Sequence, residues 1–178
     1  EEKGLVEREK YEGVTLTPEG ETVALEVVRH HRLIETYLAE HLDYDWDEVH
    51  DEADRLEHHI SEAFEQRVAE KLGDPEVDPH GDPIPRATLD PVDEAPGRPL
   101  CDHCEGDEVV VERVSDRDPA ELSYLEDAGI TPGATLVVEE VAPIGMVTVR
   151  CEGEDVSVPD RIARMIRVRR PEELATGE

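Results

Sequence analysis

The chain has 178 residues, and its 18 lysines and arginines are set against 47 aspartates and glutamates, which gives a formal net charge of −29 at pH 7. This length suits one or two small domains, and a hydrophobic content of 37% is enough for a core. The sequence has no apolar run of about 18 residues, which excludes a membrane-spanning helix. It begins at Glu1 without a signal-peptide pattern, so we expect a fragment or a processed form.

The acidic residues are spread through the apolar segments and do not form one block. Lysine occurs only at Lys3, Lys10 and Lys71, and arginine supplies the other cations. A dispersed acidic surface with little lysine is typical of a folded protein from a salt-in halophile, because such a surface keeps the protein soluble in molar salt. An ordinary acidic protein from a mesophile is the alternative.

Three cysteines do not make a disulfide framework for a chain of this length, which favours a reducing cytoplasm. Two of them form the motif Cys101-Asp102-His103-Cys104, and Cys151 follows in the second half. A structural zinc site needs four ligands. Plain reduced thiols are therefore the simpler interpretation, and a reactive or metal-binding role is the alternative.

The first part of the chain predicts a hairpin followed by a long helix. Residues 1–4 are interpreted as the end of a helix, and the apolar segments at 5–7 and 14–16 as two short strands. Thr17 is a suitable N-cap, and Pro18 suits the first helical position. Apolar residues at spacings of three and four then predict one amphipathic helix to about residue 42.

Two further helices and a proline-rich segment are expected next. Asp45 is the expected N-cap of the second helix. A break near Ser61 separates it from a third helix that ends at Gly73. Seven prolines between residues 74 and 99 disfavour regular structure there and indicate a linker.

The second half predicts a small β domain. Five short apolar segments are typical of strands, and a helix from Pro119 to Ala128 interrupts them. The strand candidates are residues 109–111, 136–138, 146–149, 156–158 and 165–168. Five strands in about 70 residues fit a small barrel better than a sandwich. We therefore expect an α+β chain whose halves are separate domains.

Histidine marks the segment that is most informative about chemistry, because six of the eight histidines fall within 30 residues. The second helix carries four side chains on one predicted stripe, at i, i+4, i+7 and i+8: His50, Asp54, Glu57 and His58. The preceding helix carries His31 and Glu35 at i and i+4. If the two helices pack antiparallel, these groups can bind manganese, iron(II), cobalt or zinc. A solvated halophilic surface is the alternative.

Three segments taken together resemble the signature of the diphtheria-toxin-repressor family, whose members are metal-activated repressors of iron or manganese uptake. They are Arg29–Glu35 (RHHRLIE), Val49–His58 (VHDEADRLEH) and Pro79–Pro85 (PHGDPIP). The likeness covers residues 1–86 in order. Residues 100–170 resemble the SH3-like (FeoA-type) third domain of the family, notably in Tyr124–Gly133 (YLEDAGITPG).

The resemblance implies a domain order. The segments are the C-terminal part of a winged helix-turn-helix with its wing hairpin (1–20), an all-α metal-binding and dimerisation domain (21–86), a proline-rich linker (87–99), an SH3-like (FeoA-type) small β-barrel (100–170) and a tail (171–178). Most of the family's helix-turn-helix is missing before Glu1. We therefore expect the full-length protein, and not this chain alone, to read DNA bases.

The resemblance also implies ligand sets for a divalent metal. The primary site would use Asp54, Glu57 and His58, and the ancillary site would use His31, Glu35 and His50. Asp116 and Asp118 lie where some members donate ligands from the third domain. A carboxylate at position 54 favours Mn²⁺ over softer metals, whereas His50 is the iron-type residue, so Mn²⁺ and Fe²⁺ both remain open.

The expected function is a metal-dependent, DNA-binding transcriptional repressor that is not an enzyme. It would act as a homodimer on double-stranded operator DNA, with Arg8 and Lys10 of the wing close to phosphate. The dimer would use apolar faces around Val49, Leu56, Ile60 and Phe64. The alternatives are a metallohydrolase built on the same cluster and a metal-buffering or ferrous-transport accessory protein. The sequence has no Gly-rich phosphate loop, GxSxG or HExxH motif that would favour an enzyme.

Overall fold

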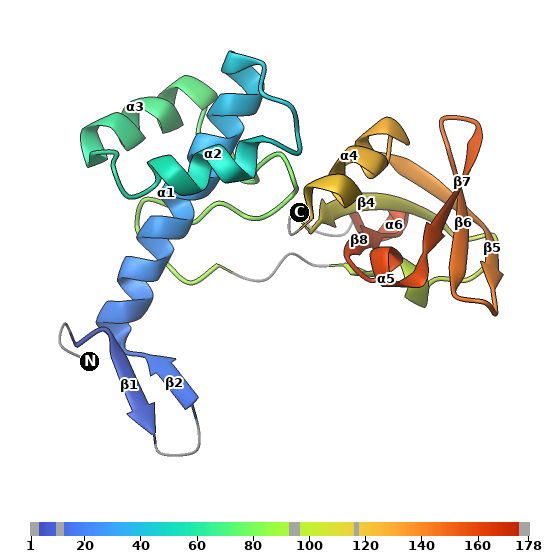
Figure 1. Cartoon of the computed structure of the whole chain (residues 1–178), viewed down its shortest axis with the longest axis horizontal. Helices are drawn as coiled ribbons and strands as arrows, with labels where there is room; N and C mark the ends of the chain where they lie inside the picture. Colours follow the sequence, from blue (N-terminus) through green and yellow to red (C-terminus); the bar gives the residue numbers. More distant parts are fainter. Residues whose placement is uncertain (1–3, 10–12, 93–96, 116–117, 175–178) are drawn as a thin grey trace.

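Two bodies of different architecture follow one another along the chain, a helical one and a β one (Figure 1). The computed structural model describes residues 4–9, 13–92, 97–115 and 118–174. The helix end expected at the very N-terminus lies mostly outside these residues. Among the described residues, no helix is both long enough and apolar enough to cross a membrane.

The hairpin precedes the long helix as expected. Strands β1 (Val6–Glu9) and β2 (Gly13–Leu16) pair antiparallel, and α1 runs over Pro18–Leu42. The Thr17 side chain caps α1 by accepting a hydrogen bond from the backbone N–H of Gly20 at 3.1 Å. A Cβ at Gly20 would lie 1.9 Å from the carbonyl oxygen of Leu5, so a glycine is required where the hairpin meets the helix.

The next two helices are α2 (Val49–Leu56) and α3 (Glu62–Leu72). The break near Ser61 and the helix end at Gly73 are as predicted: Ser61 caps α3, and Gly73 ends it in the left-handed conformation. The expected cap of α2 at Asp45 is wrong, because Glu48 holds the N-cap position and makes no side-chain capping bond. The chain turns first, with the Glu48 N–H bonded to the Asp45 carbonyl.

The helical body has two small apolar clusters around α1. Leu33, Val68, Ala69 and Ile84 form one, and Ile34, Leu38, Val49 and Ala53 form the other. Val49 is fully buried between α1 and α2, so it cannot belong to a dimer face as the sequence suggested. Phe64 and Leu56 are 47% and 36% exposed and remain available to a second copy.

The β body is a six-stranded antiparallel sheet with the order β3-β8-β4-β5-β6-β7. The strands are β3 (Arg98–Pro99), β4 (Glu108–Val114), β5 (Thr135–Ala142), β6 (Met146–Cys151), β7 (Glu154–Pro159) and β8 (Ile166–Arg169). Short helical segments connect and follow them: η1 (Leu100–Asp102), α4 (Pro119–Asp127), α5 (Asp160–Ala163) and α6 (Pro171–Leu174). The strands expected from the sequence are all present, and β3 is additional.

The first part of the proline-rich segment is packed and is more than a linker. Val77 and Pro83 form a β-bridge, and Ile84 is 6% exposed. Prolines supply no backbone N–H, so these residues form turns and an isolated bridge without a longer strand. The turn between the bridge partners carries buried polar side chains next to α1.

Candidate metal centre

His31, on α1, lies at the centre of a group of metal-ligating side chains. Its Nδ1 atom is 2.8 Å from Oε2 of Glu57, and its Nε2 atom is 2.9 Å from Oε1 of Glu35. Glu35 lies one helical turn further along α1 and is fully buried, whereas Glu57 is the C-cap residue of α2. The imidazole of His31 therefore joins the two helices.

His50 and Asp54 of α2 complete this group. Nδ1 of His50 lies 3.1 Å from both Nε2 of His31 and Oε1 of Glu35. Oδ1 of Asp54 lies 3.4 Å from Nδ1 of His31. One ligand atom each from His31, His50 and Asp54 lies within 4.8 Å of the others, a spacing that suits a shared metal ion. We refer to His31, Glu35, His50, Asp54 and Glu57 as the α1–α2 cluster.

His58 takes a different position from the one expected for the helical stripe. Helix α2 ends at Leu56, so His58 lies beyond the C-cap. Its side chain is 63% exposed, and its Nε2 atom lies 3.2 Å from Oε1 of Glu57. The i, i+8 spacing fails because it assumed a longer helix.

The α1–α2 cluster holds a proton at its centre in the absence of a cation. Burial lowers the pKa of His31, but hydrogen bonds and charge from Glu35 and Glu57 outweigh burial and raise the pKa from 6.5 to about 9. A site that stabilises an imidazolium among carboxylates also favours a divalent cation. Loss of the proton would free one ring nitrogen of His31 as a ligand.

A second, buried cluster was missed by the sequence reasoning. One ligand atom each from Glu35, Asp78 and His80 lies within 4.8 Å of the others, and these residues are 0%, 6% and 0% exposed. Among the described residues, Oε2 of Glu35 and Nδ1 of His80 have no hydrogen-bond partner. Buried polar atoms without a partner are rare, so these two ligand atoms are suited to bind a cation. We call these three residues the buried cluster.

The pKa of Asp78 is raised to about 8. Burial is the largest cause, the neighbouring carboxylates of Glu35 and Asp82 raise the pKa as well, and the nearby Arg32 lowers it by less. Arg32 brings one positive charge to the buried cluster, because its Nε atom lies 3.6 Å from Oδ2 of Asp78. The sequence signal is the Asp78-x-His80 spacing, in which His80 belongs to the PHGDPIP segment and Asp78 directly precedes that segment.

Of the third-domain candidates, Asp118 belongs to neither cluster. The carboxylate of Asp118 caps α4, where it accepts hydrogen bonds from the N–H groups of Ala120 and Glu121 at 3.0 and 3.4 Å. Asp116 lies outside the described residues. Cys101, Cys104 and Cys151 are free thiols in the β body, and none belongs to the α1–α2 or the buried cluster.

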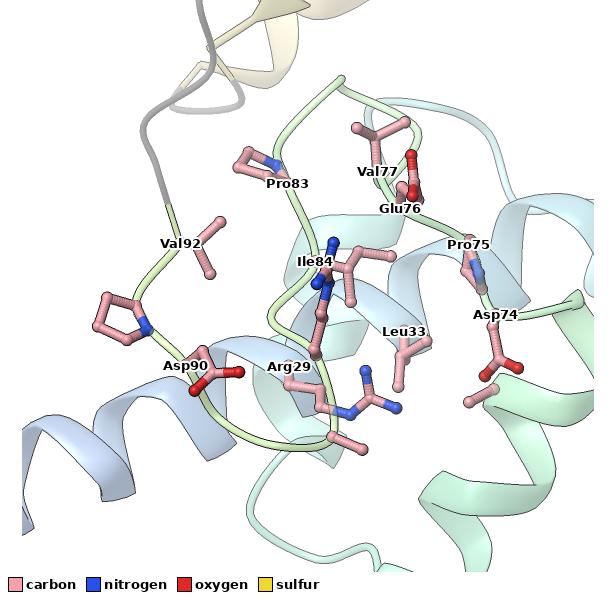
Figure 2. Close-up of a pocket in the computed structure, with 14 residues that line it drawn as sticks. Arg29, Leu33, Asp74, Pro75, Glu76, Val77, Pro83, Ile84, Asp90 and Val92 are labelled. Atoms are coloured by element: carbon pink, nitrogen blue, oxygen red, sulfur yellow. The ribbon is translucent and has the colours of Figure 1, made fainter. Parts of the chain in front are cut away.

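A cavity of about 820 Å³ opens between α1, α3 and residues 74–92 (Figure 2). Figure 2 shows Leu33 and Ile84 in its lining, with Arg29 close by. The Arg29 guanidinium is already bound to Glu65 and to the carbonyl oxygen of Pro85, both at 2.6 Å. The lining contains no member of the two clusters, so the cavity is not part of the metal centre.

Comparison with known proteins agrees with this geometry. Residues 17–86 match the family model of the iron dependent repressor, metal binding and dimerisation domain, and residues 98–170 match the FeoA domain. The diphtheria toxin repressor of Corynebacterium glutamicum is 33% identical over 181 residues, which cover 97% of this chain and 78% of the relative. The iron-dependent repressor IdeR of Mycobacterium tuberculosis is 33% identical over 176 residues, which cover 86% of this chain and 71% of the relative.

A solved structure described as a manganese-dependent transcriptional repressor in complex with manganese is also similar. It is 42% identical, with a TM-score of 0.86, over 95% of this chain and 79% of that chain. Identity at this level over most of both chains is sufficient to show common family membership. This chain belongs to the diphtheria-toxin-repressor family of metal-dependent transcriptional repressors, which are not enzymes.

Proposed function

We propose that this chain is the metal-sensing and dimerising part of a repressor that responds to Mn²⁺ or Fe²⁺ and binds operator DNA as a homodimer. The observation that carries the proposal is the convergence of α1 and α2 on one imidazole. Glu35 and Glu57 contact opposite nitrogens of His31, at 2.9 and 2.8 Å. The chain belongs to a family of repressors, and this membership favours the proposed function over a metallohydrolase or an accessory protein.

The α1–α2 cluster would hold the cation through imidazole nitrogens and carboxylate oxygens. A bound divalent cation would supply the positive charge that these carboxylates otherwise obtain from one proton. His31 and Glu35 come from α1, and His50 and Asp54 come from α2, so ligation by both pairs fixes the spacing of the two helices. The wing hairpin joins the start of α1, and its position therefore depends on that spacing (Figure 1).

Metal dependence follows from a difference in affinity between two helix arrangements. A cation shifts the equilibrium only as far as it binds the DNA-competent arrangement more tightly, typically by about 1–3 kcal/mol. Ligands that lie on one rigid helix would give no such difference. The division of the cluster between α1 and α2 supports a sensor, because opening the helices separates the ligands.

The ligand chemistry favours Mn²⁺ over Fe²⁺. Both clusters consist of imidazole and carboxylate groups, with no thiolate among their members. Hard oxygen ligands suit manganese, whereas thiolates favour softer metals. Asp54 has the carboxylate that the resemblance assigns to manganese-type members, and His58 would act through Glu57, the residue that it contacts.

DNA contact is proposed for the wing. Arg8 lies in β1, and Lys10 lies outside the described residues. Because the chain carries a net charge of −29, phosphate contact needs local positive charge of this kind. The homodimer would use exposed apolar groups on the helical body, among them Leu56 and Phe64.

The test is selection of random duplex DNA by the complete gene product, in concentrated KCl, with Mn²⁺, with anaerobic Fe²⁺ and with chelator. We expect an enriched palindromic sequence that is bound only with metal. His50→Ala should abolish the metal dependence, whereas Asp51→Ala, at the adjacent exposed position on α2, should not. DNA binding that is equal with and without metal would refute the proposal, and turnover of an ester by the metal-loaded protein would favour the hydrolase.

A further inference from the structure

The helical body supplies a tryptophan to the core of the FeoA-type domain. Trp46 lies in the connection between α1 and α2, yet it is 8% exposed and belongs to the same apolar core as Leu122 and Leu125 of α4. In Figure 1, α4 lies on the side of the β body that faces the helices. The two bodies therefore share a packed junction.

A tight turn of residues 78–82, next to Trp46, contacts strand β4. Oδ1 of Asp78 accepts hydrogen bonds from the N–H groups of His80 and Asp82, each at 2.9 Å, which shapes the turn. Gly81 has a φ of +88°, and a Cβ at this position would lie 1.9 Å from the carbonyl oxygen of Glu112. Only glycine satisfies both the backbone angle and the close approach of β4.

Polar contacts hold β4 on this turn. The N–H of Val114 donates to the carbonyl oxygen of His80 at 2.9 Å. Nε of Arg113 donates to Oδ2 of Asp82 at 2.8 Å, and NH2 of Arg32 donates to Oδ1 of the same carboxylate at 3.1 Å. Asp82 therefore links an arginine of α1 to an arginine of the FeoA-type domain.

His80 connects this junction to the buried cluster. Its Nε2 atom lies 3.0 Å from the carbonyl oxygen of Trp46, and its ring lies 5.0 Å from the indole ring. A carbonyl oxygen can only accept, so Nε2 donates to it, and Nδ1 is the ring nitrogen that remains for a cation. That Nδ1 is the atom without a hydrogen-bond partner among the described residues. A backbone carbonyl that fixes the ring in this way is typical support for a metal-binding histidine.

Trp46 makes a second contact with the same turn, because its Nε1 atom donates to the carbonyl oxygen of Pro79 at 3.0 Å. We call Trp46 and residues 78–82, together with the β4 residues 112–114 that they contact, the clasp. The same short turn carries two candidate ligands, Asp78 and His80, and the contacts to β4. Movement of the turn therefore changes the ligands and the β4 contacts together.

We infer that the clasp seats the FeoA-type domain on the helical body, and that a divalent cation in the buried cluster tightens it. The inference rests on the proposed metal-binding function and adds a second consequence of the metal, namely control of how the third domain docks. By linkage, docking and cation affinity must strengthen each other by the same factor. The relevant coupling is between sites in one chain and does not require DNA.

The experiment uses the single tryptophan of the chain and the Val114 amide as reporters. Acrylamide quenching of Trp46 and hydrogen exchange at Val114 are measured in concentrated KCl, with Mn²⁺ and with chelator. We expect Mn²⁺ to slow hydrogen exchange at Val114 by about five- to 100-fold. Mn²⁺ should also reduce the acrylamide quenching of Trp46. His80→Ala should remove this effect of the metal.

Gly81→Ala tests the clasp from the turn, and Gly133→Ala is its matched control. Gly133 also has a positive φ, of +90°, but a Cβ there meets no atom within 4 Å. We expect Gly81→Ala to expose Trp46 and to weaken Mn²⁺ binding, whereas Gly133→Ala does neither. Arg113→Gln provides a second variant, since it removes the Asp82 contact from the FeoA side and leaves the turn sequence intact.

Two results would overturn the inference, and they are distinguishable. Saturable Mn²⁺ binding by calorimetry with no change at Trp46 or Val114 would refute the coupling and leave the metal-sensing proposal intact. If Gly81→Ala and Arg113→Gln release the FeoA-type domain from the helical body but leave the Mn²⁺ affinity unchanged, the coupling is also refuted and the metal-sensing proposal stays intact. An absence of any saturable binding would refute the metal-sensing proposal itself, and the coupling with it.

Discussion

His31 and Glu57 are 26 residues apart in the chain, and Nδ1 of the histidine lies 2.8 Å from Oε2 of the glutamate. The pair joins α1 to the C-terminal end of α2, and Glu35 contacts the other nitrogen of the same ring. The contacts of this single imidazole therefore depend on the distance between the two helices.

The first prediction separates Glu57 from His58. Glu57→Gln should lower Mn²⁺ affinity by at least about tenfold, because it removes a carboxylate that is in direct contact with His31. His58→Ala should have a smaller effect, since that side chain is 63% exposed and reaches the cluster only through Glu57. Calorimetric titration of both variants measures the difference, with Glu40→Gln on the exposed part of α1 as the control. A larger loss in His58→Ala would contradict the geometry.

The second prediction concerns proton release on metal binding. Carboxylates raise the pKa of His31 to about 9 against the effect of burial, so at pH 7.5 a cation must displace a proton from the ring. Apparent Mn²⁺ affinity should rise up to about tenfold per pH unit toward pH 9. Calorimetry in two buffers of different ionisation enthalpy should show this proton release, and His31→Gln should reduce it by about one proton. Affinity that is independent of pH would count against His31 as a ligand.

The same pKa has a consequence for the stability of the metal-free chain. The folded-state pKa is raised from 6.5, so the stabilisation by protonated His31 is fully present below pH 6.5 and is lost as the pH rises through about 9. Thermal unfolding with chelator should therefore shift to lower temperature between pH 7 and pH 10. His31→Gln should flatten that part of the profile, and an equal slope in the variant would contradict the assignment.

The fourth prediction is that Asp78→Asn raises the free energy of unfolding of the metal-free chain and lowers its Mn²⁺ affinity. In the metal-free chain, burial and two neighbouring carboxylates raise the pKa of Asp78 from 3.8 to about 8, so stability due to the protonated form is lost as the pH rises through this range. Asp78→Asn keeps the accepting oxygen that shapes the turn and cannot ionise. We expect it to gain about 2 kcal/mol of unfolding free energy at pH 8 with chelator. Its Mn²⁺ affinity should fall.

Chemical denaturation and calorimetry of Asp78→Asn measure both effects on one protein. Asp74→Asn is a suitable control, because Asp74 is an exposed carboxylate of the same segment and belongs to neither cluster. Destabilisation of Asp78→Asn under all conditions would show that the carboxylate is ionised and favourable without metal.

The fifth prediction concerns the joint between the wing and α1. Gly20→Ala would place a Cβ 1.9 Å from the carbonyl oxygen of Leu5, so the hairpin must move away from the helix. We expect a loss of about 1–3 kcal/mol in unfolding free energy and weaker DNA binding by the complete gene product. Mn²⁺ affinity should be unchanged, because the α1–α2 cluster lies further along α1. Glu19→Ala, one residue earlier and exposed, is the control, and an equal loss of metal affinity in Gly20→Ala would contradict this separation.

Local signals in the sequence were sufficient for most of the helix boundaries. Thr17 and Ser61 can satisfy the free N–H groups of a helix start, and Gly73 can adopt the left-handed angle of a helix end, wherever the rest of the chain lies. The start and the end of α2 were less predictable. That segment has several acidic residues that could cap it, and a turn around the buried Trp46 decides among them.

The sequence by itself determined the types of residue in the metal centre, the start of α1, the end of α3 and the alternating pattern of the strands. It could do so because composition and spacing along one element are local properties. The tertiary structure alone decided that Glu35 lies in contact with His50 and next to His80, residues that come from three separate segments. It also decided that Val49 is buried in the helical body and that Trp46 packs into the core of the FeoA-type domain. These outcomes depend on how apolar faces pack through space, and no periodicity within one segment contains that information.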